Sequence, residues 1–445
     1  MKRTAPQDTT PTAENKSANV SLVAVSFCRP FSCLLHSSRI ASLAFPFAYI
    51  IAIGPAPPRR SYAPRQTSDM IQHTSCSSPT MSAPKLKEVN VSLPRKFDTP
   101  DEPWHRYVTV DLLHYVLGYT VFHPFVSCVL VLCLRAQYTA WHALEMRIAI
   151  AWALLMCSVG IFNIFSDRLA YGAPREVDLS EEVIVVTGGV EGLGGLLAET
   201  YGMRNANVAV LDMKKVDDEE AEEKGVLYYQ CDVGDAKQVE AAVAEIVEDL
   251  GAPTILINNA GMVRAKSILD STPEDVEQTF RTNTLSHFNT LRAVLPHMLR
   301  ERRGTIVTVS SVLGRLGAAN LSSYSASKAA LLALHQSLRA ELSQNPDAKE
   351  IKTILVTPGQ MGTKMFQNLK TPSNFFGPVV SPAEVAKSII GLVEKGESGE
   401  VALPLYAKYT ESLGALPVGI QALLRRWSAM DTAVEKAGMV EKKQN

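Results

Sequence analysis

Excess charge of either sign is lacking in this 445-residue sequence, because 44 lysines and arginines are offset by 45 aspartates and glutamates. A net charge of −1 excludes a strongly basic nucleic-acid-binding protein, so no nucleic-acid partner is expected. The seven cysteines have neither the framework of a disulfide-rich domain nor the paired spacing of a metal site. We therefore expect a reducing compartment, no metal and, because internal repeats are also lacking, no array architecture.

Acidic side chains are absent from residues 16–68, where arginines recur among serines and prolines. Such a composition cannot build a hydrophobic core, and it superficially resembles a transit peptide. The apolar run at residues 40–53 is interrupted by Pro46 and is too short to span a bilayer comfortably. Since Met81 begins a more ordinary sequence, we interpret residues 1–106 as a disordered or targeting region, part of which need not belong to the mature protein.

Formal charges are also absent between Leu112 and Leu134, and a second apolar run extends from Ile148 to Phe165. As helices these runs would reach roughly 35 and 27 Å, against a hydrocarbon core of about 30 Å. They predict a membrane hairpin over residues 107–168, with two buried helices of a soluble core as the alternative. Two histidines and Pro124 within the first run favour a tilted, kinked or re-entrant helix.

Basic residues precede the first run, at Lys85, Lys87, Arg95, Lys96 and Arg106. The positive-inside rule places that side in the cytosol, and two spans return the rest of the chain to the same side. The C-terminal Lys442-Lys443-Gln444-Asn445 is spaced as in cytosolic retrieval signals of endoplasmic reticulum membrane proteins, although charged tails are common without that role. We expect the endoplasmic reticulum membrane, or a lipid droplet, with the folded domain in the cytosol.

The centre of the chain carries a nucleotide-binding pattern. An apolar run, Val183 to Val186, leads into Thr187-Gly188-Gly189-Val190-Glu191-Gly192-Leu193-Gly194 and then a helix-like segment. A buried strand that feeds a glycine-rich turn lets the backbone approach a pyrophosphate, while the next helix supplies free N–H groups. A second apolar run ends at Asp212, about twenty residues on, where a carboxylate can bind both ribose hydroxyls.

A second motif, Tyr324-Ser325-Ala326-Ser327-Lys328, begins another helix-like stretch. Together with the glycine-rich turn it resembles the short-chain dehydrogenase/reductase family, whose pattern fits residues 179–404. The resemblance implies an α/β fold with a Rossmann-like doubly wound parallel sheet, here preceded by a transmembrane hairpin. It also implies transfer of a hydride between an alcohol and a nicotinamide cofactor.

The resemblance assigns the reaction to four residues. Tyr324 would be the base, and Asn283 would hold a proton-relay water against Lys328. Ser311 would bind the substrate oxygen, because its spacing from the tyrosine matches the family, while Ser310 would face away and be structural. The cofactor-binding residues would be Thr187, Gly188, Gly192, Leu193, Gly194, Asp212, Asp232, Val233, Asn259, Ala260, Gly261, Tyr324, Lys328, Pro358, Gly359 and Thr363. For Asp232, a helix N-cap before Ala236 is an equally good interpretation.

A phenol with a pKa near 10 is only about 0.1% ionised at neutral pH. Lys328 lies on the same helical face as Tyr324, one turn on. A cation about 4 Å away contributes roughly 4 kcal/mol at an effective dielectric near 20, which would lower the pKa by about three units. We therefore expect Lys328, with the charge of oxidised nicotinamide, to bring Tyr324 near its working range.

Cofactor preference depends on two carboxylates. Asp212 and Glu191 would both repel the 2′-phosphate of NADP(H), so NAD(H) is expected. Lys214 and Lys215, just beyond the second strand, are the counter-evidence that keeps NADP(H) possible.

Further along, residues 364–379 resemble the family's variable substrate lid. Their phenylalanines favour a lipophilic substrate. The alternative interpretation of this segment is a loop that packs on the domain surface. In residues 405–445, the segment from Ile420 to Trp427 could be an amphipathic helix in the membrane interface, with oligomer packing or a lid helix as alternatives.

These patterns predict a membrane-anchored, NAD-dependent oxidoreductase that interconverts a lipophilic primary or secondary alcohol and its aldehyde or ketone. The layout is similar to that of membrane-anchored retinol and 17β-hydroxysteroid dehydrogenases, and a homodimer is possible. An NADP-dependent ketoreductase and a non-catalytic, nucleotide-binding membrane scaffold remain the alternatives.

Overall fold

The computed structural model describes residues 108–217, 221, 223–366, 373–428 and 431. The expectations for residues 1–106, including the basic residues before the first apolar run, lie outside this part of the chain. The C-terminal dilysine also lies outside it.

A seven-stranded parallel sheet forms the centre of the protein, with the strand order β3-β2-β1-β4-β5-β6-β7. The strands are β1 (Val183–Thr187), β2 (Asn207–Asp212), β3 (Leu227–Gln230), β4 (Ile255–Asn258), β5 (Arg303–Val309), β6 (Glu350–Val356) and β7 (Gly399–Val401). The chain runs outward from β1 to β3 and then returns to β4 on the other side of β1. Such a reversal leaves a crevice at the carboxyl ends of the strands, where ligands bind. The predicted doubly wound sheet is confirmed.

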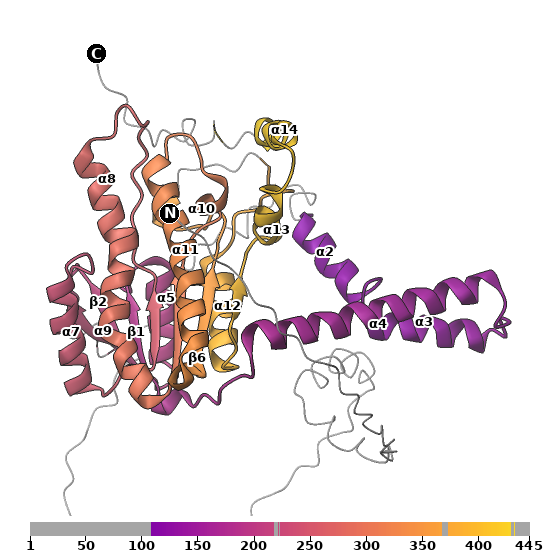
Figure 1. Ribbon diagram of the computed structural model, residues 1–445, viewed down its shortest axis with the longest axis horizontal. Helices are drawn as coiled ribbons and strands as arrows, with labels where there is room; N and C mark the ends of the chain where they lie inside the picture. The colour runs from indigo at the N-terminus through magenta and orange to yellow at the C-terminus, as the bar shows by residue number, and fades with distance from the viewer. Residues whose placement is uncertain (1–107, 218–220, 222, 367–372, 429–430, 432–445) are drawn as a thin grey trace, which may run out of the picture. The chain divides into compact units, whose positions relative to one another are not determined.

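Helices cover both faces of the sheet (Figure 1). One face carries α5 (Gly192–Gly202) and α12 (Pro382–Glu394), and the other carries α7 (Ala236–Asp249), α9 (Ser286–Glu301) and α11 (Ser322–Gln344). The other elements of the folded domain are η3 (Leu179–Glu181), α8 (Pro273–Phe280), η4 (Arg281–Leu285), α10 (Leu313–Leu316), η5 (Pro346–Ala348), η6 (Lys364–Phe366), α13 (Leu405–Leu413) and α14 (Val418–Ser428).

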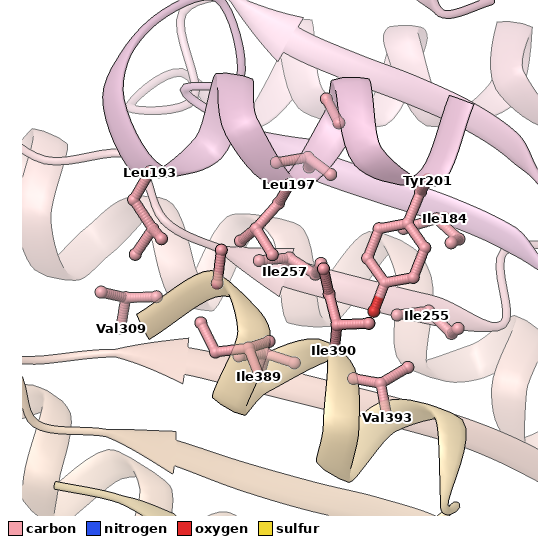
Figure 2. Packing of buried hydrophobic residues seen from close by; sticks show 14 of the residues in the cluster. Ile184, Leu193, Leu197, Tyr201, Ile255, Ile257, Val309, Ile389, Ile390 and Val393 are labelled. Atoms are coloured by element: carbon pink, nitrogen blue, oxygen red, sulfur yellow. The ribbon is translucent and has the colours of Figure 1, made fainter. Parts of the chain in front are cut away.

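Strand residues alternate between two apolar cores. In β1, Ile184 packs toward α5 and α12, against residues such as Leu197 and Ile389 (Figure 2). Its neighbour Val185 packs toward α7, α9 and α11 on the opposite face. Because both faces are covered, each central strand is a continuous apolar run rather than an alternating one.

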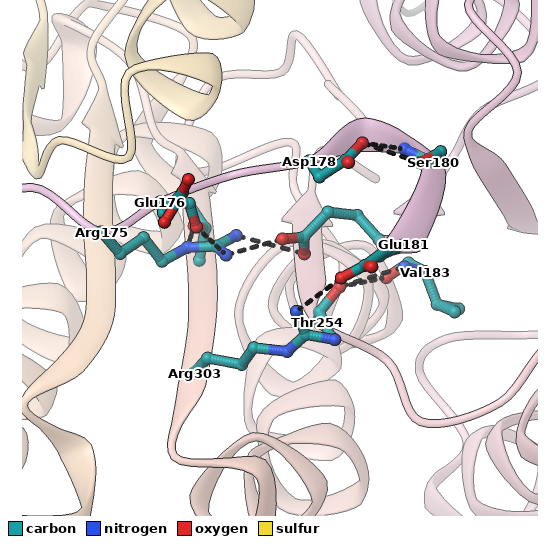
Figure 3. Close-up of polar contacts among 10 residues, drawn as sticks. Arg175, Glu176, Asp178, Ser180, Glu181, Val183, Thr254 and Arg303 are labelled. Atoms are coloured by element: carbon teal, nitrogen blue, oxygen red, sulfur yellow. Dashed lines mark hydrogen bonds and ion pairs between the residues drawn. The ribbon is translucent and has the colours of Figure 1, made fainter.

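A buried ion pair fixes the segment that enters the sheet (Figure 3). Arg175 donates two hydrogen bonds to the carboxylate of Glu182, at 2.6 and 3.2 Å, and a third to the Thr305 hydroxyl at 3.1 Å. The two charged side chains are 1% and 0% exposed. Removing one partner of such a pair leaves an uncompensated buried charge, which typically costs about 3–5 kcal/mol. The pair therefore holds the start of β1 against β5.

Three apolar helices precede the sheet: α2 (Val110–Tyr119), α3 (Pro124–Ala136) and α4 (Leu144–Tyr171). Within the described residues α4 alone is long and apolar enough to cross a membrane. The first predicted run is broken, because α2 and α3 meet at an angle of 52°. Proline at the first position of α3 explains the break, since a proline has no N–H to continue the preceding helix.

The broken segment packs against α4 through polar and sulfur contacts. The indole nitrogen of Trp152 donates to the Val121 carbonyl at 3.0 Å, and the sulfur atoms of Cys128 and Cys157 are 3.8 Å apart. A broken span and a re-entrant loop both fit this geometry, by length and composition. Whether these helices insert in a membrane stays a prediction.

Candidate active site

Because glycines have no Cβ, the glycine-rich turn after β1 can pack closely against the end of β4. A Cβ at Gly188, which has a φ of +63°, would lie 2.9 Å from the Ala260 Cα, and one at Gly194 would collide with the Gly188 carbonyl and the Asn259 amide. Asn259 in turn donates to the carbonyls of Thr187 and Gly188, at 3.2 and 3.0 Å. The carboxyl ends of β1 and β4 are thereby locked together.

The space in front of α5 stays open. A Cβ at Gly192, where φ is +66°, would meet only the Thr363 methyl group, at 4.0 Å. No side chain caps the α5 N-terminus, so its first N–H groups face this space. A glycine cradle before an uncapped helix N-terminus fits the pyrophosphate of a dinucleotide.

The next strand end carries the carboxylate expected at the ribose. Asp212 accepts hydrogen bonds from the backbone N–H groups of Val190, at 3.2 Å, and Lys214, at 3.0 Å. The Glu191 carboxylate pairs with the ammonium groups of Lys214, at 2.7 Å, and Lys364, at 3.4 Å. The hydrogen bond from Lys214 is the main reason that the Glu191 pKa is lowered. Of the two lysines weighed against NAD(H), Lys214 is thus paired with an acid.

Asp232 does not cap a helix. The N-cap of α7 is Asp235, which accepts from the Lys237 N–H at 2.9 Å, so the N-cap interpretation of Asp232 is wrong. Instead, Asp232 accepts from the Gly234 N–H at 2.9 Å and pairs with the Arg281 guanidinium at 2.7 Å. It lies in the cavity wall at the end of the β3 side of the sheet.

A cavity of about 1700 Å³ lies above the carboxyl ends of the strands. It exceeds the roughly 300–1,000 Å³ of ordinary ligand pockets, so a dinucleotide and a second molecule can share it. Three of the predicted site residues are absent from its lining: Thr187, Gly194 and Asn283. All the others line it. We call this space the active-site cavity.

Three of the four predicted reaction residues line this cavity: Ser311, Tyr324 and Lys328. Tyr324, which is 5% exposed, is hydrogen-bonded to Ser311. Burial raises the pKa of Tyr324 to about 12, against the opposing effect of the Ser311 hydrogen bond. Burial also lowers the pKa of Lys328 to about 8. At neutral pH the polypeptide alone therefore holds a neutral phenol beside an ammonium group that can lose its proton.

The expected lowering of the Tyr324 pKa by Lys328 is not found in the polypeptide alone. The Lys328 ammonium donates to the Val309 carbonyl at 2.9 Å and lies 6.0 Å from the centre of the tyrosine ring. This ammonium group is thus held at the end of β5, and burial of the phenol is the main influence on the Tyr324 pKa, which it raises.

The two neighbouring serines face different partners. The Ser310 hydroxyl donates to the Lys328 carbonyl at 2.8 Å, which fixes the first turns of α11 against β5. The Ser311 hydroxyl accepts from the Leu313 N–H at 3.2 Å and reaches Tyr324. Ser311 is therefore the serine with a hydroxyl beside the phenol.

Asn283 sits in η4, a π-helical turn that the sequence pattern did not reveal. Its amide donates to the Met262 carbonyl and the Ser327 hydroxyl, both at 3.0 Å, and accepts from the Met262 N–H at 2.7 Å. Both amide N–H groups are thus used to hold the loop after β4 against α11. A part in proton relay stays a prediction for this residue.

Sequence reasoning missed two buried histidines behind the lysine. His287 and His335 are 1% and 3% exposed, and burial lowers their pKa values to about 3 and about 4. The ring of His335 contacts the Thr308 hydroxyl at 3.2 Å. His287 follows Asn283 by one helical turn, which is the sequence signal that could have placed it near Lys328. Both imidazoles are neutral packing groups at physiological pH.

Two aromatic side chains of the predicted lid, Phe366 and Phe376, line the cavity. The Phe366 ring lies 6.2 Å from the Tyr324 ring, edge to face, at the inner end. The centre of the Phe376 ring lies 4.8 Å from the ring centres of both Phe375 and Trp427, edge to face. Phe375 and Phe376 are 38% and 47% exposed, so a role of this loop as a substrate lid stays a prediction.

The C-terminal helix α14 also belongs to the cavity wall. Arg425 donates to the carbonyls of Leu316, at 2.9 Å, and Gly317, at 3.3 Å, and pairs with Asp431 at 2.7 Å. Asp431 accepts from the Ala319 N–H at 3.2 Å. We call these contacts the Arg425 clasp. It ties α14 to the loop between Ser311 and Tyr324, which is the arrangement expected of a lid helix.

Comparison with known proteins gives a consistent set of relatives. A family model described as short chain dehydrogenase matches residues 182–374. An uncharacterised oxidoreductase of Saccharomyces cerevisiae is 32% identical over 251 residues, covering 56% of this chain and 82% of the relative. Retinol dehydrogenase 10-B of Danio rerio is 33% identical over 235 residues, covering 46% and 70%. For 17-beta-hydroxysteroid dehydrogenase 13 of Rattus norvegicus, the identity is 30% over 244 residues, covering 53% and 80%.

Proposed function

The chain belongs to the short-chain dehydrogenase/reductase family and is an NAD(P)-dependent oxidoreductase; from this premise we propose that it interconverts a lipophilic alcohol and its aldehyde or ketone. One observation supports the proposal most directly. Ser311 and Tyr324 line the same cavity as the glycine-rich turn and as the aromatic side chains of Phe366, Phe376 and Trp427. The catalytic and cofactor-binding roles of the residues described above are part of this proposal.

The proton chemistry falls to three side chains. Oxidation of an alcohol requires its hydroxyl proton to leave, and Tyr324 is the group placed to accept it. Ser311 holds the substrate oxygen by a hydrogen bond, and Lys328 stabilises the ionised phenol. A bound nicotinamide dinucleotide supplies the hydride acceptor or donor and, when oxidised, a positive charge. In the reverse direction the neutral phenol of Tyr324 donates its proton to the carbonyl oxygen.

NAD(H) is proposed as the preferred cofactor. The Asp212 carboxylate lies at the ribose end of the cavity and is held there by two backbone N–H groups. Glu191 lies in the glycine-rich turn and engages both nearby ammonium groups, those of Lys214 and Lys364. A 2′-phosphate would have to displace this carboxylate and approach a second one.

A lipophilic substrate is supported by the chemistry of the cavity wall. Beyond Tyr324 the wall continues through Phe366, Phe376 and Trp427. Aromatic and aliphatic walls favour substrates that gain from leaving water. Two relatives are named for retinol and a 17β-hydroxysteroid, which are substrates of this kind.

The proposal includes membrane attachment through residues 107–168, with the catalytic domain at residues 179–404 and in the cytosol. It is supported by the length and apolar character of α4 and by the broken α2–α3 segment. Because α13 and α14 complete the cavity wall, residues 405–431 act with the catalytic domain. The endoplasmic reticulum is the proposed membrane, on the strength of the C-terminal dilysine alone.

The test is a substrate screen with the purified full-length protein in detergent or vesicles. Retinoids, sterols and long-chain alcohols are assayed with NAD+ and NADP+, and the matching carbonyl compounds with NADH and NADPH. Turnover of a lipophilic alcohol with NAD+ at a higher kcat/KM than with NADP+ is the expected result. Binding of NADH without turnover of any lipophilic compound would support a non-catalytic scaffold instead.

Membrane attachment is tested separately in microsomes. The protein should stay in the pellet after carbonate extraction, and external protease should digest its catalytic domain. Release into the carbonate supernatant would remove the membrane part of the proposal, and protection of the domain would reverse its orientation.

A further inference from the structure

We propose that the active-site cavity opens onto the membrane surface, and that the substrate enters it from the lipid phase between α2 and α14. This inference rests on the proposed function for the lipophilic nature of the substrate. It assigns the first apolar helix a second role, as a wall of the catalytic cavity.

The first turn of α2 is fastened to the mouth of the cavity. The Val110 N–H donates to the Phe375 carbonyl in the lid at 3.0 Å, and Val110 itself lines the cavity. The next residue, Asp111, accepts from the Leu405 N–H at 2.6 Å. Leu405 is the first residue of α13, so the carboxylate caps the positive end of that helix (Figure 1 shows the two helices side by side).

Placing the Asp111 carboxylate at this position costs desolvation free energy. It stands at the start of an apolar stretch, and its second carboxylate oxygen is buried with no hydrogen-bond partner among the described residues. Burying a carboxylate costs free energy unless it is compensated, and the α13 N-terminus provides that compensation. An acid in the first turn also suits the N-terminus of α2 itself, so the evidence for docking is the hydrogen bond from Leu405, which joins α2 to the cavity wall.

Exposed apolar side chains continue around the mouth on α2, the lid and α14. Leu113 of α2 is 51% exposed, Phe376 of the lid is 47% exposed, and Leu423 and Trp427 of α14 are 67% and 63% exposed. We call this set the apolar rim. Phe376 and Trp427 line the cavity and contact each other, and exposed apolar side chains beside a cavity are typical of a surface that is covered in the working protein.

The proposed cover is a lipid bilayer, because the same chain continues from the rim into apolar helices. The helix α2 leads directly into α3 and then into α4, which is long enough to cross a membrane. The polar face of α14 carries Arg425 and Arg426, and its apolar face carries an exposed tryptophan. Basic residues opposite a tryptophan and leucines are typical of helices that lie in a membrane interface.

The rim and the reaction centre are the two ends of one apolar path. At the outer end, the centres of the Phe376 and Trp427 rings are 4.8 Å apart. At the inner end, the Phe366 ring lies 6.2 Å from the Tyr324 ring. A lipophilic molecule can therefore pass from the bilayer to Tyr324 without exposing its apolar part to water, which avoids the free-energy cost of transferring that part from lipid into water.

Contact of the rim with lipid is tested by photocrosslinking, which does not depend on turnover. Benzoylphenylalanine is placed at Leu423 or Leu113 in the full-length protein, reconstituted in phosphatidylcholine vesicles that contain an alkyne-tagged phosphatidylcholine. Ile161 on α4 is the positive control, and Glu240, exposed on α7 away from the apolar helices, is the water-facing control. Labelling at both rim positions should approach that at position 161. Labelling no greater than at position 240, while position 161 is labelled, would overturn the proposal.

The entry route is tested with a matched pair at Asp111. The variant Asp111→Asn keeps an oxygen acceptor for the Leu405 N–H, whereas Asp111→Leu removes it. With retinol in phosphatidylcholine vesicles as the probe, Asp111→Leu should raise KM at least fivefold with little change in kcat or NADH affinity, and Asp111→Asn should stay near wild type.

An equal KM for both variants and wild type would show that α2 docking plays no part in substrate entry and would overturn that step. If the wild type does not turn over retinol, a sterol or long-chain alcohol from the screen replaces it as the probe. If none of these alcohols is turned over, the proposed substrate class fails, while the crosslinking result still decides whether the rim meets lipid. The two failures are thus distinguishable.

Discussion

At the scale of single residues, burial sets the protonation states on which the reaction depends. The Tyr324 phenol is neutral at physiological pH, because burial raises its pKa to about 12. The Lys328 ammonium is easier to deprotonate than usual, because burial lowers its pKa to about 8. The resting protein is therefore prepared to give a proton to a carbonyl, and must lose one before it can oxidise an alcohol.

The pH profile should show this asymmetry. Oxidation needs ionised Tyr324, the fraction of which grows as pH rises toward its pKa, so kcat for alcohol oxidation should rise between about pH 6 and 9. Reduction uses the protonated phenol, and its kcat should stay flat or fall over the same range. Steady-state rates in both directions give the comparison; an oxidation rate independent of pH would mean that Tyr324 is not the group that titrates.

The two serines should separate function from stability. Ser311→Ala removes the hydroxyl beside Tyr324 and should lower kcat by about a hundredfold. Ser310→Ala removes a buried hydrogen bond to the Lys328 carbonyl, so it should keep most activity while losing about 1 kcal/mol of unfolding free energy. Kinetics and denaturant titration of both variants provide the measurement. The opposite pattern would assign the substrate oxygen to Ser310.

Cofactor choice can be tested at one position. Glu191→Arg removes an acid that engages Lys214 and Lys364, and adds a cation, so three positive groups become available to a 2′-phosphate. The ratio of kcat/KM for NADP(H) to that for NAD(H) should rise at least about tenfold, or about 1.4 kcal/mol. Glu191→Gln, which frees the lysines without adding charge, should give a smaller shift. Asp212 is left intact because it accepts from the Val190 N–H in the glycine-rich turn and from the Lys214 N–H after β2. A wild-type protein that already prefers NADPH would contradict the assignment.

At the scale of elements, α14 acts through the contacts that hold it over the cavity. The Arg425 clasp joins α14 to the loop that connects the serine and the tyrosine of the reaction centre. Through these contacts, the position of α14 depends on the loop that contains Leu316, Gly317 and Ala319. Loosening the clasp should therefore affect substrate binding before it affects hydride transfer.

The clasp is tested by Arg425→Gln. The variant loses the ion pair with Asp431 and at least one bond to the loop carbonyls, so KM for a lipophilic substrate should rise severalfold while NADH affinity stays unchanged. Arg426→Gln, at the next and exposed position of the same helix, is the control and should behave as wild type. A matching loss of NADH affinity in the Arg425 variant would mean that the clasp supports the whole fold rather than the lid.

Elements whose shape follows from local pattern could be predicted, and elements shaped by distant contacts could not. The strand and turn from Val183 to Gly194 are fixed by an apolar run and by glycines that no larger residue can replace. By contrast, η4 bends because the Asn283 amide is held by Met262 and Ser327, which lie far from it in the sequence. The break before Pro124 was indicated by the proline and the two histidines of the first run, but its angle was not.

The candidate site divides in the same way. The motif around Tyr324 and Lys328 identified the residues, because their spacing along a helix is a local property. The pKa of Tyr324 could not be obtained from that spacing, since it depends on how deeply the phenol is buried and on the Val309 carbonyl that holds the lysine. The Arg425 clasp joins residues more than a hundred positions apart and left no pattern to find.

At the scale of the whole molecule, contacts join the apolar helices to the catalytic domain at both ends of the apolar region. The segment after α4 is fixed by the buried pair of Arg175 and Glu182, and the start of α2 is fixed by Asp111 at the N-terminus of α13. Substrate cavity, lid and apolar helices therefore share contacts from both ends of the apolar region. This arrangement suits an enzyme with a substrate that resides in the membrane.

The central claim is that a lipophilic alcohol transfers a hydride to NAD+ while Tyr324 accepts its hydroxyl proton. It is tested most directly by incubating the full-length protein with NAD+ and a long-chain alcohol or retinol deuterated at the carbinol carbon, and by mass spectrometry of the nicotinamide product. Deuterium should appear in the reduced nicotinamide with the wild type and be absent with Tyr324→Phe, which should still bind NADH. Reduced nicotinamide without deuterium, or equal transfer by the Tyr324→Phe variant, would contradict the claim.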